Sequence, residues 1–208
     1  QAKLKGTQLT TNPNGFNINS HRKYVKTDDG YLHLVYDSQG SVWYEVSPDN
    51  GATWYIQNNG QPISVTGKQP AIDYGSFYDP YTEETYHQTA ITWQESYGSS
   101  SSKIKVAYFD RYEDVLIGRM NWRDTKDVAT VSGSYSTTNC YPVICMAYSN
   151  FNIVYKNGAA GALLSRTGVV NISYGIYFSI NNPLTLTGTN SYSVNPSIAV
   201  NKSGTTSI

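Results

Sequence analysis

Short segments of this chain alternate between apolar and polar residues, with the period of two that is typical of β-strands. Residues 31–36 place Leu32 and Leu34 on one face, and residues 37–40 have the composition of a turn. Residues 41–46 alternate in the same way. The pattern predicts a β-hairpin here, and its recurrence along the chain predicts an all-β fold.

Similar pairs of strands are predicted further along the chain. Residues 86–93 and 103–109 are the equivalent pair in a second unit, joined through the serine-rich segment 99–102. Residues 151–155 and 175–180 are predicted to play these roles in a third unit. The composition agrees, because 19 Tyr and 17 Gly against 2 Met favour strands and turns over helices.

Each unit begins with a similar stretch, which indicates an internal repeat. Residues 21–30 align without gaps with residues 195–204, and both stretches end in glycine. Residues 69–74 and 141–146 begin in a similar way. Three of the four stretches carry a proline near their start, where the first carries an arginine. These positions are Arg22, Pro70, Pro142 and Pro196.

Composition and charge limit the functions that are expected of this chain. The 208 residues are enough for one large β domain or two small ones. Basic and acidic residues number 15 each, so the formal net charge is 0 and neither nucleic-acid binding nor a polybasic membrane patch has electrostatic support. No run of 18 apolar residues occurs, so no transmembrane helix is predicted. Polarity comes mainly from uncharged residues, which suits an extracellular protein.

The eight residues from Ser47 to Trp54 have the form S-x-D-x-G-x-T-W, in which each fixed position suits a tight β-hairpin. Ser and Asp side chains accept hydrogen bonds from backbone N–H groups of the turn. Gly supplies a positive φ, and Thr and Trp begin the return strand. The fixed positions are Ser47, Asp49, Gly51, Thr53 and Trp54.

This motif resembles the Asp box of the sialidase/BNR-repeat β-propeller family and matches it at all five fixed positions. In that family the box is structural and lies away from the active site. The resemblance implies a β-propeller of four-stranded antiparallel blades, with residues 1–208 as part of one domain. The predicted blades are residues 17–67, 68–139, 140–193 and 194–208.

The fourth of these blades is expected to be incomplete. Ile208 aligns with Leu34, in the middle of a predicted strand, so the chain holds about three blades and the start of a fourth. Residues 1–16 include a candidate outer strand that would close the ring. An incomplete ring predicts that missing residues or another chain supply the remainder.

The resemblance also implies what a sialidase would need: an Arg triad that grips a sugar carboxylate, a Tyr–Glu nucleophile pair and an Asp acid/base. The family's first Arg lies two residues before the proline that begins a blade. The matching positions are Ser20, Lys68, Cys140 and Val194, and none is arginine. No catalytic residue is therefore assigned. Arg22 is a candidate ligand-gripping residue, with a solvated blade edge as the simpler expectation.

The polar segment 76–86 is a second candidate, because it mixes aromatic residues with carboxylates. Such a loop can form a sugar-stacking platform or a calcium loop, and packing of its rings on the rim is the simpler alternative. The candidate ligand residues are Tyr78, Asp79, Tyr81 and Glu83. Apart from this calcium alternative, no metal site and no cofactor is predicted, because the three histidines are widely separated.

The two cysteines, Cys140 and Cys145, are too far apart to bond on one flat strand. A disulfide would need a bulge or turn at Pro142, so two free buried thiols are the favoured interpretation.

Two functions from different classes follow. The first is a secreted or cell-surface propeller that serves as a binding or structural module for a glycan or an extracellular protein partner. The alternative is an exo-sialidase-type glycoside hydrolase whose catalytic residues lie partly outside this segment. The missing arginines favour the first, since a fold alone does not determine function.

Overall fold

The computed structural model describes residues 21–111, 117–158, 161–179, 183–190, 195–200 and 206–207. Within these residues the chain forms antiparallel sheets and one short helix. Consecutive strands pair with each other, so each sheet is a meander. The predicted all-β class with four-stranded antiparallel sheets is confirmed. The candidate outer strand in residues 1–16 lies outside the described residues.

The elements follow one another in a regular order. The first sheet contains β1 (Tyr24–Lys26), β2 (Leu32–Ser38), β3 (Ser41–Ser47) and β4 (Tyr55–Ile56). The single-turn helix α1 (Gln57–Gly60) comes next. The second sheet contains β5 (Gly67–Asp79), β6 (Glu84–Tyr97), β7 (Ser101–Arg111) and β8 (Asn121–Ser132). The third contains β9 (Val143–Ala147), β10 (Asn150–Lys156), β11 (Leu163–Asn171) and β12 (Gly175–Phe178), with β13 (Leu184–Thr185) beside β11. A hairpin of β14 (Ala199–Val200) and β15 (Thr206–Ser207) follows.

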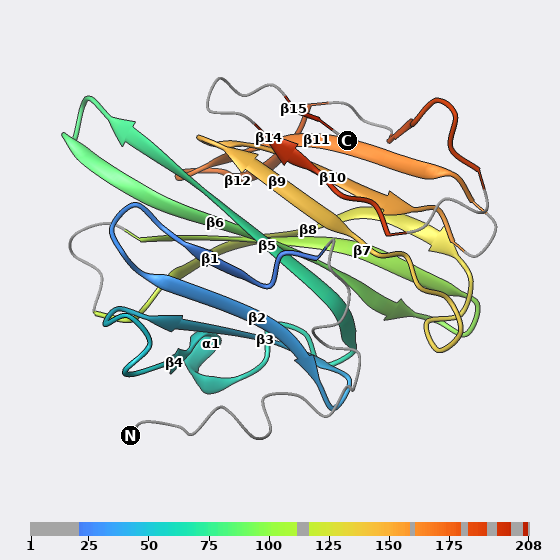
Figure 1. The fold of residues 1–208 in the computed structure, drawn as a ribbon, viewed down its shortest axis with the longest axis horizontal. Helices are drawn as coiled ribbons and strands as arrows, with labels where there is room; N and C mark the ends of the chain where they lie inside the picture. Colours follow the sequence, from blue (N-terminus) through green and yellow to red (C-terminus); the bar gives the residue numbers. More distant parts are fainter. Residues whose placement is uncertain are drawn as a thin grey trace.

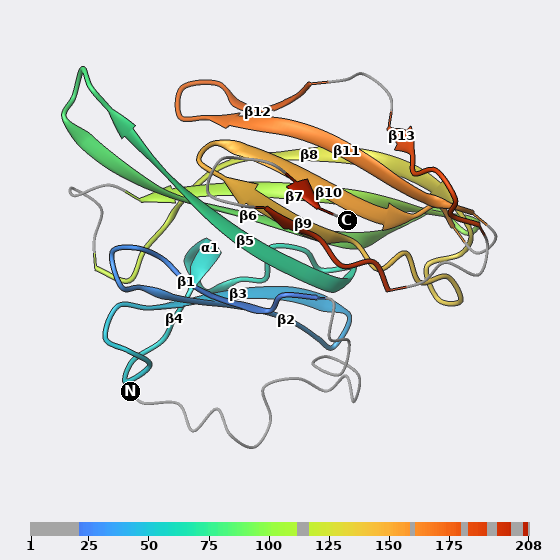
Figure 2. The same cartoon turned by 45° about the horizontal axis from the view of Figure 1, so that its top comes forward.

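The three sheets stack face against face, with the second sheet in the middle (Figure 2). One apolar cluster fills the space between the first and second sheets, and another fills the space between the second and third. A third, smaller cluster joins the third sheet to the β14 segment. The first strands of successive units, β1, β5, β9 and β14, are neighbours (Figure 1).

The middle sheet is buried on both faces, and its sequence shows why. In β5, Ala71 belongs to the cluster shared with the third sheet, whereas Ile72 belongs to the cluster shared with the first. Ala90 and Ile91 divide in the same way in β6. Successive side chains of a strand point to opposite faces, so a doubly covered strand needs a continuous apolar run.

The starts of the units share an unusual backbone conformation. Gln69, Tyr141 and Asn195 have φ values of 56°, 49° and 53°, and each precedes the proline that begins its unit. A non-glycine residue with positive φ is uncommon. Three such residues occupy the same position of the predicted repeat, so the repeat is present in the structure as well as in the sequence.

Buried polar side chains join each sheet to the start of the next one. Asp37, at the end of β2, accepts a hydrogen bond from the backbone N–H of Gln69 at 2.9 Å. Gln94 in β6 accepts one from the N–H of Cys140 at 2.9 Å and donates one to the carbonyl of Thr138 at 2.9 Å. Asp37 and Gln94 occupy equivalent positions, so the same kind of contact sets the stacking of both sheet pairs.

The β14–β15 hairpin follows the register of the first hairpin. Ala199 pairs with Ser207, and Val25 pairs with His33. Val25 and Ala199 are equivalent in the alignment of 21–30 with 195–204, and His33 and Ser207 are equivalent when the same offset is continued. The predicted repeat register therefore holds in the strand pairing.

The predicted strand pairs of the first two units are confirmed, but the third is partly wrong. The partner of β10 is β11, and β12 pairs with the other edge of β11. The alternation of apolar and polar residues does not predict β11, because this strand buries polar and small residues. Arg166 lies over the ring of Phe178, 3.7 Å from its centre. A Cβ at Gly168 would overlap the ring of Phe151 and the carbonyl oxygen of Tyr177.

The two cysteines are free and buried, as the favoured interpretation predicted. Cys140 packs between the second and third sheets, whereas Cys145 faces the β14 segment. Because they lie in different clusters, the local disulfide does not form. Burial raises the pKa of the Cys140 thiol to about 11, which keeps it in the unreactive protonated form at neutral pH.

Gly75 is required where the second and third sheets come closest. A Cβ there would overlap the backbone carbonyl of Tyr148, which cannot move as an end of a side chain can. Replacing Gly75 by Ala is expected to lower the free energy of unfolding by about 1–3 kcal/mol through overpacking. Urea denaturation measures the change. As a control, Gly98→Asn faces open space at a φ that Asn tolerates, and should change stability by less than about 1 kcal/mol. Equal stability of the two variants would contradict the close approach.

His33 lies buried between the first two sheets. Its Nδ1 is 2.8 Å from the Tyr44 hydroxyl, and its Nε2 is 3.1 Å from the Thr27 hydroxyl. Burial, with a smaller contribution from His87, lowers the pKa of His33 from 6.5 to about 3. The native protein therefore holds this imidazole neutral where the unfolded chain would protonate it.

Stability is predicted to fall as the pH drops from 6.5 towards 3, because the unfolded state binds a proton on His33 that the folded state rejects. At pH 5 this residue alone should cost about 2 kcal/mol relative to neutral pH. Urea denaturation at pH 7 and pH 5 tests this. A His33→Asn variant should be less stable at pH 7 but should lose less stability on acidification. An unchanged pH dependence in that variant would contradict the assignment.

Candidate functional site

The Asp-box segment forms the turn between β3 and β4. The Asp49 carboxylate accepts hydrogen bonds from the Thr53 N–H at 2.7 Å and the Thr53 hydroxyl at 2.6 Å. The Ser47 hydroxyl accepts the N–H of Gly51 at 2.8 Å and donates to Asp49 at 2.9 Å. The indole N–H of Trp54 donates to the Gly51 carbonyl at 3.0 Å. Gly51 has a φ of 92°, the positive value that its role requires.

This turn is a closed network of its own groups. The hydrogen bonds from Thr53, first of all its hydroxyl, lower the pKa of Asp49. None of the five fixed residues lines the hollow described below. The observed contacts are those of a turn that stabilises an outer hairpin.

A hollow of about 440 Å³ lies where the first strands of the four units meet. We call it the central hollow. Its lining comes from the β1 segment, β5, β9 with the turn that follows it, and β14. The volume falls within the range of roughly 300–1,000 Å³ that is usual for ligand pockets.

The lining residues occupy equivalent positions of the repeat. Asp28, Ser76 and Tyr148 each lie seven residues after the start of their unit, at His21, Gln69 and Tyr141 respectively. Tyr74, Met146 and Val200 share another position. The repeat therefore brings chemically different side chains, at equivalent positions of their units, into the lining of one hollow.

Arg22 lines the central hollow, where its side chain is 43% exposed. Its guanidinium forms an ion pair with Asp73, whose side chain is only 5% exposed. Asp73 also accepts a hydrogen bond from the N–H of Met146 at 2.8 Å. Burial raises the pKa of the Asp73 carboxyl, and Arg22 opposes this most strongly. The pair thus joins the first three units at the floor of the hollow.

Asp28 provides a second, exposed carboxylate in the hollow. It accepts hydrogen bonds from the Ser76 hydroxyl at 2.8 Å and the Tyr74 hydroxyl at 3.3 Å. Burial, and then the negative charge of Asp28, raise the pKa of Tyr74, so the phenol keeps its proton. Tyr148 adds an aromatic residue that is 60% exposed.

A charged cluster surrounds Asp29, the residue that follows Asp28 in the chain. The guanidinium of Arg111 pairs with Asp29 and lies over the ring of Tyr31, 4.0 Å from its centre. His87 Nε2 is 3.8 Å from Asp29 Oδ2, and burial lowers the pKa of His87. The charges of Arg111 and Asp29 neutralise each other. Both side chains are largely buried, so each needs the other as a partner.

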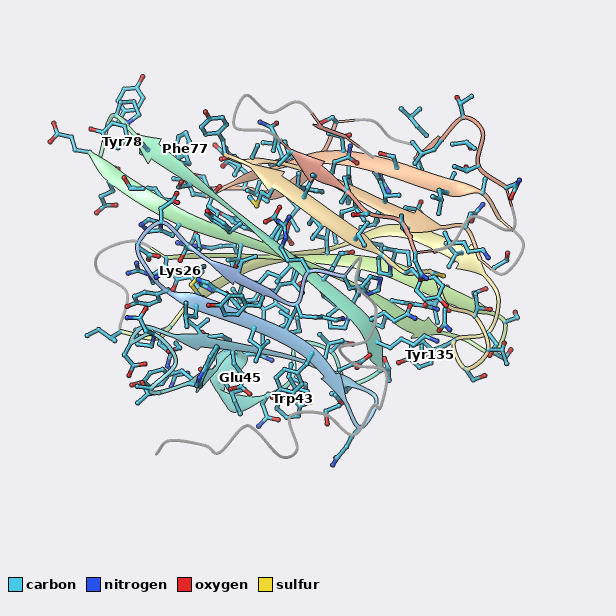
Figure 3. The ribbon with its side chains drawn as sticks, viewed as in Figure 1. Lys26, Trp43, Glu45, Phe77, Tyr78 and Tyr135 are labelled. Atoms are coloured by element: carbon cyan, nitrogen blue, oxygen red, sulfur yellow. The ribbon has the colours of Figure 1, made fainter. Side chains whose placement is uncertain are left out.

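The other sequence candidates lie elsewhere. Tyr78 and Asp79 are at the end of β5, and Tyr81 and Glu83 are in the turn before β6. This hairpin extends beyond the neighbouring strands, as Figure 1 and the labelled Tyr78 in Figure 3 show. The expected inter-strand loop is therefore largely a continuation of two paired strands. None of the four residues lines the central hollow.

No group of three or more His, Cys, Asp or Glu side chains in the described residues could hold a metal ion. Among the same residues, none of the helices has the length and apolar character needed to cross a membrane.

No protein-family model, curated protein or solved structure matches this chain. Membership of the Asp-box family therefore stays a proposal that rests on the chain's own residues. The interpretation of the central hollow likewise rests on its own geometry and charge.

Sequence reasoning found Arg22 but missed the other groups of the hollow. Asp28, Asp73, Tyr74 and Tyr148 carry no motif, and each looks like an ordinary strand or turn residue. The signal that could have found them is the repeat itself. Residues at one position of aligned first strands converge when the units are arranged around a common axis.

The Asp-box network predicts the effect of removing its acceptor. Asp49→Ala should lower the melting temperature, because two Thr53 donors and the Ser47 hydroxyl lose their shared partner. Asp49→Asn keeps one acceptor oxygen and should fall between Ala and the natural residue. Thermal unfolding followed by circular dichroism tests the order. An Asp49→Ala protein with an unchanged melting temperature but impaired ligand binding would show that the box is functional rather than structural.

Proposed function

We propose that this chain is part of an Asp-box β-propeller, comprising about three blades and the start of a fourth, that acts as a secreted or cell-surface binding module. The central hollow is its ligand site, and a glycan is its ligand. The observation that carries the proposal is the convergence of register-equivalent residues from four first strands on one hollow. Propellers place their first strands around a central channel, where ligands are commonly bound.

The chemistry of the hollow supports a glycan. Asp28 and Asp73 offer carboxylate oxygens, Arg22 offers N–H donors, and Tyr148 offers an exposed ring. Sugars combine hydroxyl groups with apolar C–H faces, and binding sites for such ligands combine placed polar groups with aromatic surfaces.

A hydrolase is the alternative, and Arg22 is the observation that favours it. Glycoside hydrolysis needs two carboxyl groups flanking the scissile bond, one of them able to give up a proton. Asp73 is tied to Arg22 and to the N–H of Met146, and Asp28 is bound by two hydroxyl groups. The Arg22 ion pair and the N–H of Met146 hold Asp73 in place, so Asp28 is the carboxylate of the described lining that a ligand can reach. One accessible carboxylate instead of two supports binding over hydrolysis.

Glycan retention and glycoside turnover separate the two functions. The protein is applied to an array of immobilised oligosaccharides and, separately, to fluorogenic sialosides. We expect retention on the array without turnover. Ala147→Trp, which adds bulk to the lining of the hollow, should abolish retention. Ser99→Trp, on the exposed turn between β6 and β7, is the matched control and should bind normally.

Two results would overturn the proposal. Sialoside turnover that Arg22→Gln abolishes would establish the hydrolase. Retention of no glycan by a folded protein, with a cooperative thermal transition, would exclude the glycan-binding function.

A further inference from the structure

The charge of the central hollow determines which glycans it can accept. Among the described residues, its lining contains one cation, Arg22, and two anions, Asp28 and Asp73. Arg22 is committed to Asp73, and that carboxylate is 5% exposed. Removing the guanidinium from its partner would leave a buried and unpaired negative charge, which is strongly unfavourable. The hollow therefore presents the charge of Asp28 to a ligand.

Asp28 is suited to bind donors only. An ionised carboxylate has about four lone-pair sites and no proton to donate. The hydroxyl groups of Ser76 and Tyr74 occupy one site on each oxygen. Further sites face an exposed environment, because Asp28 is an exposed residue. Ligand hydroxyl groups can donate to them, whereas a ligand carboxylate cannot.

Tyr148 supplies the complementary apolar surface. Its backbone is held against Gly75, so the position of the residue is set by the contact between β5 and the β9–β10 turn. The residue is nevertheless 60% exposed, and it lines the hollow. A sugar ring that stacks on Tyr148 would bring its hydroxyl groups towards the polar lining.

We infer that the central hollow binds a neutral, hydroxyl-rich sugar residue and rejects sugars that carry a carboxylate. This inference rests on the proposed function and names its ligand class. Asp28 accepts hydroxyl donors and repels an acidic sugar, because like charges across an interface reduce affinity.

Matched pairs of immobilised glycans test the inference. Oligosaccharides that end in galactose, glucose, mannose or N-acetylglucosamine are compared with the same chains capped by sialic acid. We expect at least one neutral glycan to bind at least about tenfold more tightly than its capped counterpart. Raising the salt concentration should reduce that ratio, because it screens the repulsion by Asp28.

Variants assign the selectivity to the hollow. Asp28→Asn should weaken binding of the neutral glycan about tenfold or more and should also reduce the discrimination against the capped one. Tyr148→Ala should weaken both forms and leave their ratio unchanged. Asp79→Asn, a carboxylate on the projecting hairpin outside the hollow, is the matched control and should bind within about twofold of the natural protein. Thermal unfolding of each variant verifies that it is folded.

The outcomes separate this inference from the proposed function. Preference for sialylated glycans that is lost in Ala147→Trp would retain the hollow as a glycan site and overturn the inference. Neutral-glycan binding that Asp79→Asn weakens and Asp28→Asn does not would move the site to the hairpin and also overturn it. Binding of no glycan would overturn both.

Discussion

Burial of the second sheet on both faces is the constraint on which the rest of the structure depends. Its strands carry apolar side chains at successive positions, such as Ala71 and Ile72, or Ala90 and Ile91. Apolar side chains on both faces need a cover on both faces, and the first and third sheets provide it. Stacking of these sheets brings their first strands together, and the central hollow exists because those strands converge.

Apolar burial brings the sheets together, but it is not directional, and polar contacts set how they are aligned. Asp37 and Gln94 bind backbone groups at the start of the next unit, in places from which water is excluded. A shift of one sheet along its neighbour would leave these buried groups without partners, at a cost comparable to a lost hydrogen bond each. The contacts that align the units therefore also place the side chains that line the hollow.

In the function that we propose, the Asp box contributes to stability and the central hollow to recognition. Every fixed side chain of the box is engaged within its own turn, so it has little capacity left for a ligand. In the hollow, Asp73 and Arg22 are engaged with each other, whereas Asp28 and Tyr148 remain exposed. The ion pair, together with the N–H of Met146, links three units, and the other exposed groups are available to a partner. A motif that is prominent in the sequence can therefore be remote from the residues that meet the ligand.

Local patterns were sufficient to predict most strands, the turn at Ser47–Trp54, the repeated starts and the free cysteines. These features depend on period-two alternation, on turn chemistry and on spacing, all of which act over a few residues. The pattern failed at β11, where the half-buried Arg166 lies over an aromatic ring and Gly168 is buried against a ring and a neighbouring backbone. Alternation and repetition are enough to predict an all-β chain of repeated four-stranded units. That Arg22 and Asp28 of the first unit share a hollow with Asp73 of the second and Tyr148 of the third could not be predicted locally, because these units meet through sheet stacking.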